Sequence, residues 1–228
     1  MRSSRLLFAS AVALPVLVVA QALVLGTPPG PEASGAEVVS WFSSQSGAVR
    51  SFVWVMTVFA PVFAIFAGLV RDRLPSPHRD VFFVGAIAFV AETAVSTWIW
   101  AGLSWHPDQL EPGAARTLLD ITSFWGPVLN GVTITMLAPV VVLSWGVRPV
   151  LPRWLGVVGG IALVEQSIET ITIFGHSGFT APGGPMNLML GAGLCTIWWV
   201  CLGITLARGS ELRPAASPAV EESRATAT

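Results

Sequence analysis

The chain has 228 residues, of which 53% are hydrophobic and only 11% are charged, and its formal net charge at pH 7 is −1. A soluble domain carries about a quarter charged residues, so this composition excludes an ordinary soluble globule. The low net charge and the apolar content together also exclude a disordered chain and a nucleic-acid-binding protein, which leaves a protein that crosses a membrane several times.

Apolar runs of about 20 residues, long enough to cross a hydrocarbon layer of about 30 Å, occur six times along the chain. They predict membrane-spanning helices at Leu6–Gly26, Phe52–Val70, Val81–Leu103, Ile121–Trp145, Leu155–Gly175 and Asn187–Ala207. Clusters of proline and glycine separate the runs, and these residues end helices. The sequence therefore predicts an all-α polytopic bundle of six transmembrane helices within residues 1–208, followed by a disordered cytoplasmic tail at 209–228.

The first apolar run also has features of a secretory signal peptide. Arg2 and Arg5 precede it, and Ala20-Gln21-Ala22 has the small-residue pattern of a cleavage site. The run continues through residues 23–25, past the position at which a signal sequence turns polar. This favours a retained helix, with cleavage as the alternative.

The arginines are distributed unequally between the two sides of the predicted bundle. Only Arg50 and Arg116 fall on one side, and the other side receives Arg2, Arg5, Arg71, Arg73, Arg79, Arg148, Arg153, Arg208, Arg213 and Arg224. Cytoplasmic loops of membrane proteins are enriched in basic residues. We therefore expect both termini to be cytoplasmic, in agreement with an even number of helices.

A weak internal similarity relates residues 85–93 to residues 159–167, and Gly-Pro precedes Asn130 much as it precedes Asn187. Duplication of helical hairpins, giving three related hairpins, would explain the similarity. Chance similarity between apolar segments is the alternative.

Three carboxyl groups, those of Glu92, Glu165 and Glu169, fall inside predicted spans. Each ionisable group costs about 2.5–3.5 kcal/mol at the bilayer centre on insertion scales. In a helix, Glu165, Glu169, Thr172 and His176 share one face because they are spaced at i, i+4, i+7 and i+11. This polar stripe would run from the middle of the membrane to its outer surface.

The fourth predicted helix carries a comparable stripe that includes Asn130. Hydrocarbon offers such groups no hydrogen-bond partners, so the polar faces are expected to meet in a shared interior. The candidate ligand- or proton-binding residues are Glu92, Asn130, Glu165, Glu169, Thr172 and His176. No arginine lies in any predicted span, so a proton, a metal ion or a cationic ligand would have to balance any ionised carboxylates. The structural alternative is that these residues only form hydrogen bonds between helices, each of which contributes roughly 0.6 kcal/mol to stability.

The stretch Leu151-Pro152-Arg153-Trp154-Leu155-Gly156, the loop Ala181-Pro182-Gly183-Gly184 and the last helix with its tryptophans resemble an uncharacterised family of bacterial six-helix integral membrane proteins, a domain of unknown function. The resemblance covers about residues 50–207, and Glu92 matches an acidic residue in the third helix of that family. A family acidic residue in the last helix has no counterpart here. The resemblance implies the same architecture and a multi-pass location in a bacterial plasma membrane, and it implies no activity.

Three functions are compatible with these residues. The first is binding or transport of a proton, a cation or a small amphipathic ligand at the buried carboxyl groups. The second is a small membrane enzyme that uses a neutral glutamate as general acid on a lipophilic substrate, as in terpene cyclases. The third is a structural or regulatory membrane subunit. Membrane lipids and a lipophilic or cationic small molecule are the expected partners, nucleic acid is not, and no cofactor, metal site, catalytic residue or oligomeric state is predicted.

Overall fold

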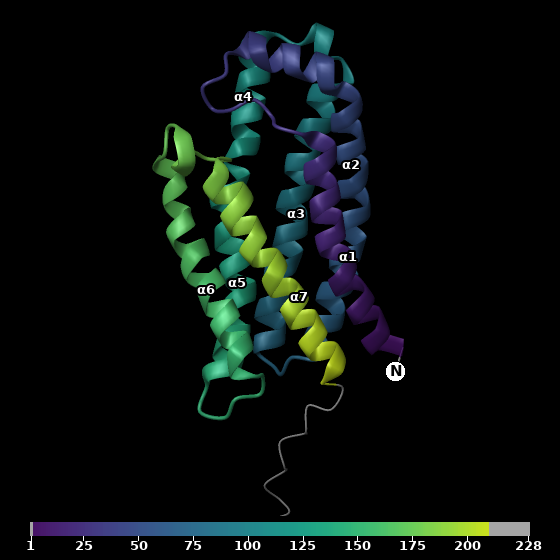
Figure 1. Cartoon of the computed structure of the whole chain (residues 1–228), viewed down its shortest axis with the longest axis vertical. Helices are drawn as coiled ribbons and strands as arrows, with labels where there is room; N and C mark the ends of the chain where they lie inside the picture. Colours follow the sequence, from purple (N-terminus) through teal and green to yellow (C-terminus); the bar gives the residue numbers. More distant parts are fainter. Residues whose placement is uncertain (1, 210–228) are drawn as a thin grey trace, which may run out of the picture.

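A computed structural model describes residues 2–209, and the regular elements in this part of the chain are all helical (Figure 1). The α-helices are α1 (Arg2–Leu25), α2 (Gly35–Arg71), α3 (His78–Trp105), α4 (Pro112–Ser123), α5 (Trp125–Trp145), α6 (Arg153–Glu169) and α7 (Ala192–Arg208). Shorter turns connect them, namely the 3-10 helices η1 (Pro107–Gln109), η2 (Thr170–Phe174) and η3 (Gly178–Thr180) and the π-helix η4 (Met186–Gly191).

Six helical segments are long and apolar enough to cross a membrane, with α4 and α5 forming one of them. The predicted all-α fold with six spans is thereby confirmed. The predicted disordered tail at 209–228 lies outside the described residues, except for its first residue. Arg213 and Arg224 belong to this part of the chain.

Helix α2 begins at Gly35, well before the predicted start at Phe52. A capping box starts it, in which the backbone N–H of Glu37 donates to Ser34 Oγ and the N–H of Ser34 donates to a carboxylate oxygen of Glu37. Val38 and Phe42 then pack into a small core at one end of the bundle with residues of α3 and α4. The first part of α2 accordingly runs across the upper end of the bundle in Figure 1 before the helix turns downward.

Helix α4 likewise begins at Pro112 rather than at the predicted Ile121. Glu111 is its N-cap, because its carboxylate accepts the backbone N–H of Ala114 at 2.8 Å. Hydrogen bonds from the N–H groups of Ala114 and Gly113 hold the pKa of the Glu111 carboxyl below its usual value. The helix that results packs on α2 and α3 and leads directly into α5.

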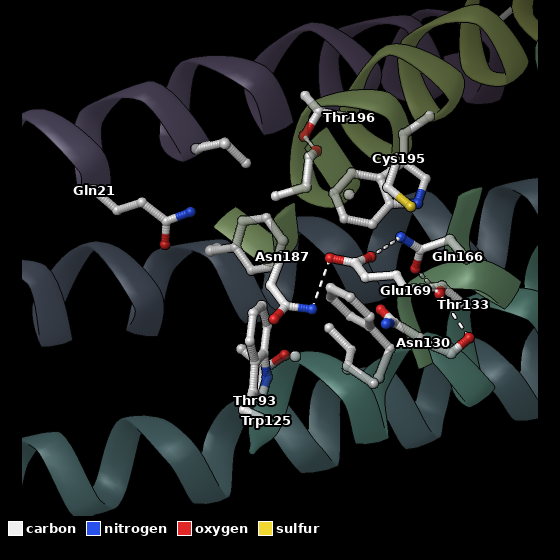
Figure 2. Close-up of a pocket in the computed structure, with 18 of the residues that line it drawn as sticks. Gln21, Thr93, Trp125, Asn130, Thr133, Gln166, Glu169, Asn187, Cys195 and Thr196 are labelled. Atoms are coloured by element: carbon white, nitrogen blue, oxygen red, sulfur yellow. Dashed lines mark hydrogen bonds between the residues drawn. The ribbon is translucent and has the colours of Figure 1, made fainter. Parts of the chain in front are cut away.

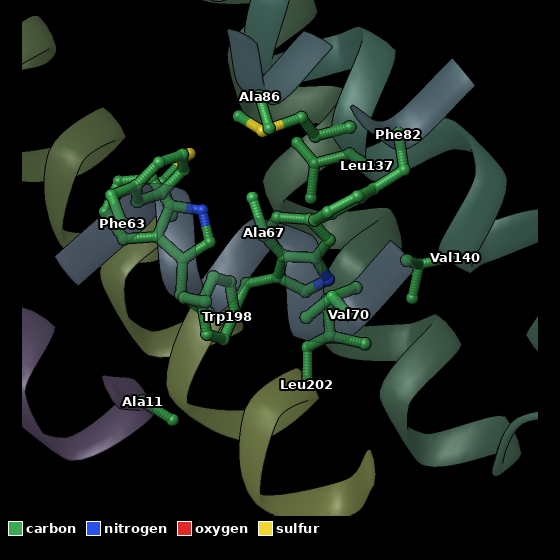
Figure 3. Packing of buried hydrophobic residues seen from close by; sticks show 14 of the residues in the cluster. Ala11, Phe63, Ala67, Val70, Phe82, Ala86, Leu137, Val140, Trp198 and Leu202 are labelled. Atoms are coloured by element: carbon green, nitrogen blue, oxygen red, sulfur yellow. The ribbon is translucent and has the colours of Figure 1, made fainter. Parts of the chain in front are cut away.

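The main hydrophobic core lies between α2, α3, α5 and α7 (Figure 3). Phe63, Phe82 and Trp198 are fully buried in it. Helix α1 contributes Leu7, Ala11 and Leu14 to the same core, so it is an integral part of the packed bundle. Helix α6 packs mainly on α5 and leaves an apolar face exposed, as expected for a helix at the border of a membrane bundle.

The two ends of the bundle differ in charge. Arg50 and Arg116 belong to the upper end in Figure 1, whereas the other described arginines lie at or near the lower end, where the chain starts and α7 ends: Arg2, Arg5, Arg71, Arg73, Arg79, Arg148, Arg153 and Arg208. The upper end carries the acidic residues Glu32, Glu37, Asp108, Glu111 and Asp120, whereas the lower end carries only Asp72 and Asp80 among the described residues. The bundle therefore has one basic end and one acidic end.

Candidate functional site

A cavity of about 80 Å³ lies among the helices, and α1, α2, α3, α5, α6, η4 and α7 all contribute to its wall (Figure 2). It lies between the middle of the bundle and the acidic end, because Thr93 is near the middle of α3 whereas Gln21 and Asn187 are close to the end of α1 and the start of η4. The polar residues that line it are Gln21, Thr93, Asn130, Thr133, Gln166, Glu169, Asn187 and Thr196. The aromatic residues that line it are Phe59, Phe89, Trp125 and Trp199.

Glu169 is the acidic residue of the cavity wall, and only 1% of its surface is exposed. Asn187 Nδ2 donates to its Oε1 at 2.7 Å, and Gln166 Nε2 donates to its Oε2 at 2.7 Å. With the Asn130 amide turned so that its nitrogen faces acceptors, that nitrogen lies 3.2 Å from Glu169 Oε2. Both carboxylate oxygens therefore accept amide N–H groups, the donors that suit an ionised carboxylate.

Glu165 is connected to Glu169 through a shared amide. Gln166 Nε2 also donates to Glu165 Oε2, at 2.9 Å, so one amide nitrogen serves two carboxyl groups. The oxygen of the same amide accepts the hydroxyl of Thr133 from α5. Glu165 Oε1 is buried and has no hydrogen-bond partner in the described part of the chain. The pair is thus held by α5 and α6 together and keeps one free acceptor.

The backbone at the start of the last span brings Asn187 to Glu169. The π-helical turn η4 precedes α7, and such turns are common at functional sites. Gly191, at the end of this turn, allows the backbone to approach Glu169, since a Cβ atom there would overlap Glu169 Oε2. Gly126 on α5 has a similar role, because its Cβ would lie 2.7 Å from Asn187 Cγ. Small residues therefore create the space that the polar side chains fill.

The predicted polar stripe on the fifth span holds only in part. Glu165 and Glu169 share the buried face of α6, and the buried hydroxyl of Thr172 lies 3.4 Å from Asn187 Nδ2. The α-helix ends at Glu169, however, and η2 continues it with tighter 3-10 geometry up to Phe174. His176 follows in the loop and is not buried, so it does not belong to the cluster.

Glu92 is separate from the cavity wall. It is half-buried on α3, its Oε2 is buried without a hydrogen-bond partner in the described residues, and it is not among the residues that line the cavity. Its neighbour Thr93 points to the cavity instead and is labelled in Figure 2. Of the six candidate residues, Asn130, Glu165, Glu169 and Thr172 are thus brought together, and Glu92 and His176 are not.

Several residues of the cavity wall were not predicted from the sequence. Gln166 is the central amide of the network but was not a candidate, and Asn187 was predicted only as the start of a span. Gln21 lay in the suspected cleavage site. The sequence does contain a signal for them, because amide side chains inside apolar runs are as costly to leave unpaired as other polar groups.

None of the known protein families, curated proteins and solved structures with which the chain was compared matches it. The chain is therefore not assigned to a family, and the resemblance noted above stays an expectation from the sequence. The fold itself defines the chain as a multi-pass membrane protein, and the described site is a cavity in the bundle with a carboxyl pair in an amide network.

Proposed function

We propose that this protein binds a proton or a small cation at the Glu165–Glu169 pair and carries it through the membrane. The observation that supports this most is the setting of Glu169, which is almost fully buried, accepts amide N–H groups at both oxygens and borders a cavity. Asn130 and Thr172 complete the amide and hydroxyl surroundings of the pair.

The charge balance at the cavity supports a cationic occupant. Amide groups stabilise a carboxylate by hydrogen bonding and do not neutralise it, and a buried charge is kept only when it is paired. No arginine is among the described residues that line the cavity. A proton on the carboxyl group or a cation beside it would supply the missing positive charge.

The size of the cavity favours a small occupant over a lipophilic substrate. A cavity of about 80 Å³ is roughly half the size of the 150 Å³ cavity that accommodates benzene. It has room for a few water molecules or a cation with few heavy atoms. A substrate of the size that terpene cyclases take would require the helices to move apart.

The charge pattern supports an orientation. With the basic end facing the cytoplasm, both termini are cytoplasmic and the cavity lies nearer the outer, acidic end. Acidic residues around an entrance raise the local concentration of cations. The location in a bacterial plasma membrane is part of the same proposal and rests on the resemblance described above.

Flux measurements in proteoliposomes test this proposal. We expect proton or small-cation flux with the native protein, and loss of most of it in Glu169→Gln and Glu165→Gln, because glutamine keeps the shape and removes the exchangeable charge. Asp108→Asn, which removes an acid of the outer loop, is the control and is expected to keep most of the flux. Unaltered flux in both glutamine variants, or no flux in the native protein, would instead favour a structural subunit in which the pair only joins helices.

A further inference from the structure

We propose that the cation for which the cavity is built is a small organic ammonium ion, such as methylammonium or another amine with few heavy atoms. This inference rests on the proposed function, because it assigns a chemical class to the occupant of the same site. It follows from what lines the cavity besides the carboxylate, namely aromatic rings and a hydroxyl without a partner in the described residues, rather than a shell of oxygen ligands.

Three aromatic rings from three helices line the cavity. Phe59 of α2, Phe89 of α3 and Trp199 of α7 all line it and pack on one another, with ring centroids 5.3 Å apart for Phe89 and Trp199 and 6.4 Å apart for Phe59 and each of the other two. Aromatic rings attract ammonium groups, by about 0.5–1 kcal/mol at exposed sites and about 2 kcal/mol when water is excluded. Ring surfaces are also compatible with the methyl or methylene groups of an organic cation.

The oxygen atoms at the site already accept hydrogen bonds and are therefore not free to surround a bare metal ion. Ca²⁺ takes six to eight oxygen ligands, and Mg²⁺ requires near-ideal octahedral geometry. Both oxygens of Glu169 already accept amide N–H groups, and the oxygen of Gln166 accepts the Thr133 hydroxyl. An ammonium group needs fewer oxygen ligands, because it can bind through charge, one or two hydrogen bonds and ring surfaces.

Thr93 supplies an independent sign of a missing occupant. It lines the cavity, only 6% of its surface is exposed, and its Oγ1 has no hydrogen-bond partner in the described residues. Buried polar atoms are almost always satisfied, so such an atom indicates a ligand or a water molecule. Thr93 and Glu169 both line this cavity and are labelled in Figure 2. An ammonium ion in the cavity would have this hydroxyl and the carboxylate as hydrogen-bond acceptors.

The indole N–H groups of Trp125 and Trp199 also lack partners among the described residues, and both side chains line the cavity. These are donors, so they do not bind the cation itself. A water molecule that accompanies the ammonium ion would accept from them. The cavity therefore fits a small, partly hydrated ammonium ion and excludes cations with several bulky substituents.

Calorimetric titration of the purified protein in lipid nanodiscs tests the inference. Methylammonium chloride is expected to bind at least severalfold more tightly than sodium chloride or tetraethylammonium chloride at equal ionic strength. Removal of a ring from the wall in Phe89→Leu or Trp199→Leu is expected to weaken methylammonium binding about fivefold or more, equivalent to about 1 kcal/mol.

Phe63→Leu is the matched control. Phe63 stacks on Phe89 with centroids 4.7 Å apart and contacts Trp199 at 5.0 Å, but it does not line the cavity. It belongs to the same ring cluster, so its loss should destabilise the protein similarly while leaving methylammonium affinity nearly unchanged. Equal loss of affinity in Phe63→Leu and Phe89→Leu would overturn the inference, because packing alone would then explain the effect.

The failure of this inference is distinguishable from the failure of the proposed function. Flux that depends on Glu169, together with equal or absent binding of methylammonium, would overturn the assignment of an organic cation and leave a proton or inorganic cation as the occupant. Absence of both binding and flux would overturn both. Tetraethylammonium binding as tight as that of methylammonium would also contradict the size limit.

Discussion

Gln166 connects most of the buried polar groups that meet in this bundle. Its nitrogen donates to Glu165 and Glu169, and its oxygen accepts from Thr133 on the neighbouring helix. A single side chain thus links both carboxyl groups to α5. Because this amide bonds to three partners in a low-dielectric setting, its removal leaves several groups unpaired at once.

We predict that Gln166→Leu lowers the free energy of unfolding by about 1–3 kcal/mol, the cost of leaving buried hydrogen-bonding groups without a partner. Thermal unfolding in detergent would show this as an earlier transition. Ser167→Ala is the control, since the adjacent Ser167 is exposed and its hydroxyl donates to the Leu163 carbonyl of its own helix. Equal transitions for both variants would show that the network contributes little to stability.

At the scale of single residues, the sequence was informative about Glu165, Glu169 and Asn130 and not about the other amides. The spacing of Glu165 and Glu169 placed them on one face of a helix, and the polar stripe of the fourth span placed Asn130 in the shared interior. The partners of those groups depend on which helices pack together, as with Asn187, and spacing within one segment does not contain that information. Glu92 was grouped with the others only because it lies at a similar depth in the membrane. In the structure its side chain does not line the cavity, whereas that of its neighbour Thr93 does.

Helix η4 with α7 is the element on which the cavity geometry depends most. The π-helical turn places Asn187 against Glu169, and Gly191 lets that turn approach the carboxylate closely. A second glycine, Gly193, follows at the start of α7 and has open space where a Cβ would be. The two glycines therefore differ in environment although they are close in sequence.

We predict that Gly191→Ala displaces the Glu169 carboxylate and lowers stability by about 1–3 kcal/mol, the usual cost of overpacking. It should also reduce cation flux severalfold, because the amide contacts of Glu169 are disturbed. Gly193→Ala should leave both unchanged or slightly raise stability, since alanine favours the helix. Similar behaviour of the two variants in thermal unfolding and flux assays would contradict the close approach at Gly191.

At the scale of elements, hydropathy located the six spans correctly and misplaced several ends. The starts of α2 and α4 were missed because these helical turns lie at the polar end of the bundle and carry mixed residues, so they interrupt the apolar runs. The capping box at Ser34 and Glu37 is a local signal that indicates the start of α2. The end of α6 at Glu169 was not evident, because η2 continues the apolar pattern with a different periodicity.

The described part of the chain has a basic end and an acidic end, and the carboxyl cavity lies between the middle of the bundle and the acidic end. The unequal distribution of arginines along the sequence predicts this division, and the described arginines follow it. A cation that arrives from the acidic side would reach Glu169 after crossing only part of the bundle, whereas the aromatic core of Phe63, Phe66 and Trp198 closes the path toward the basic end. Transport would therefore require helix movement on that side.

The most direct measurement is the infrared carbonyl absorption of protonated carboxyl groups. It is recorded in lipid for the native protein and for Glu169→Gln, at a pH at which the native band has half of its full intensity. Addition of methylammonium, with sodium in a parallel sample, should decrease the native band as the cation replaces the proton at the Glu165–Glu169 pair, and the variant should show little change. A native band that neither cation affects, or an equal change in Glu169→Gln, would contradict the exchange of a proton for a cation at this site.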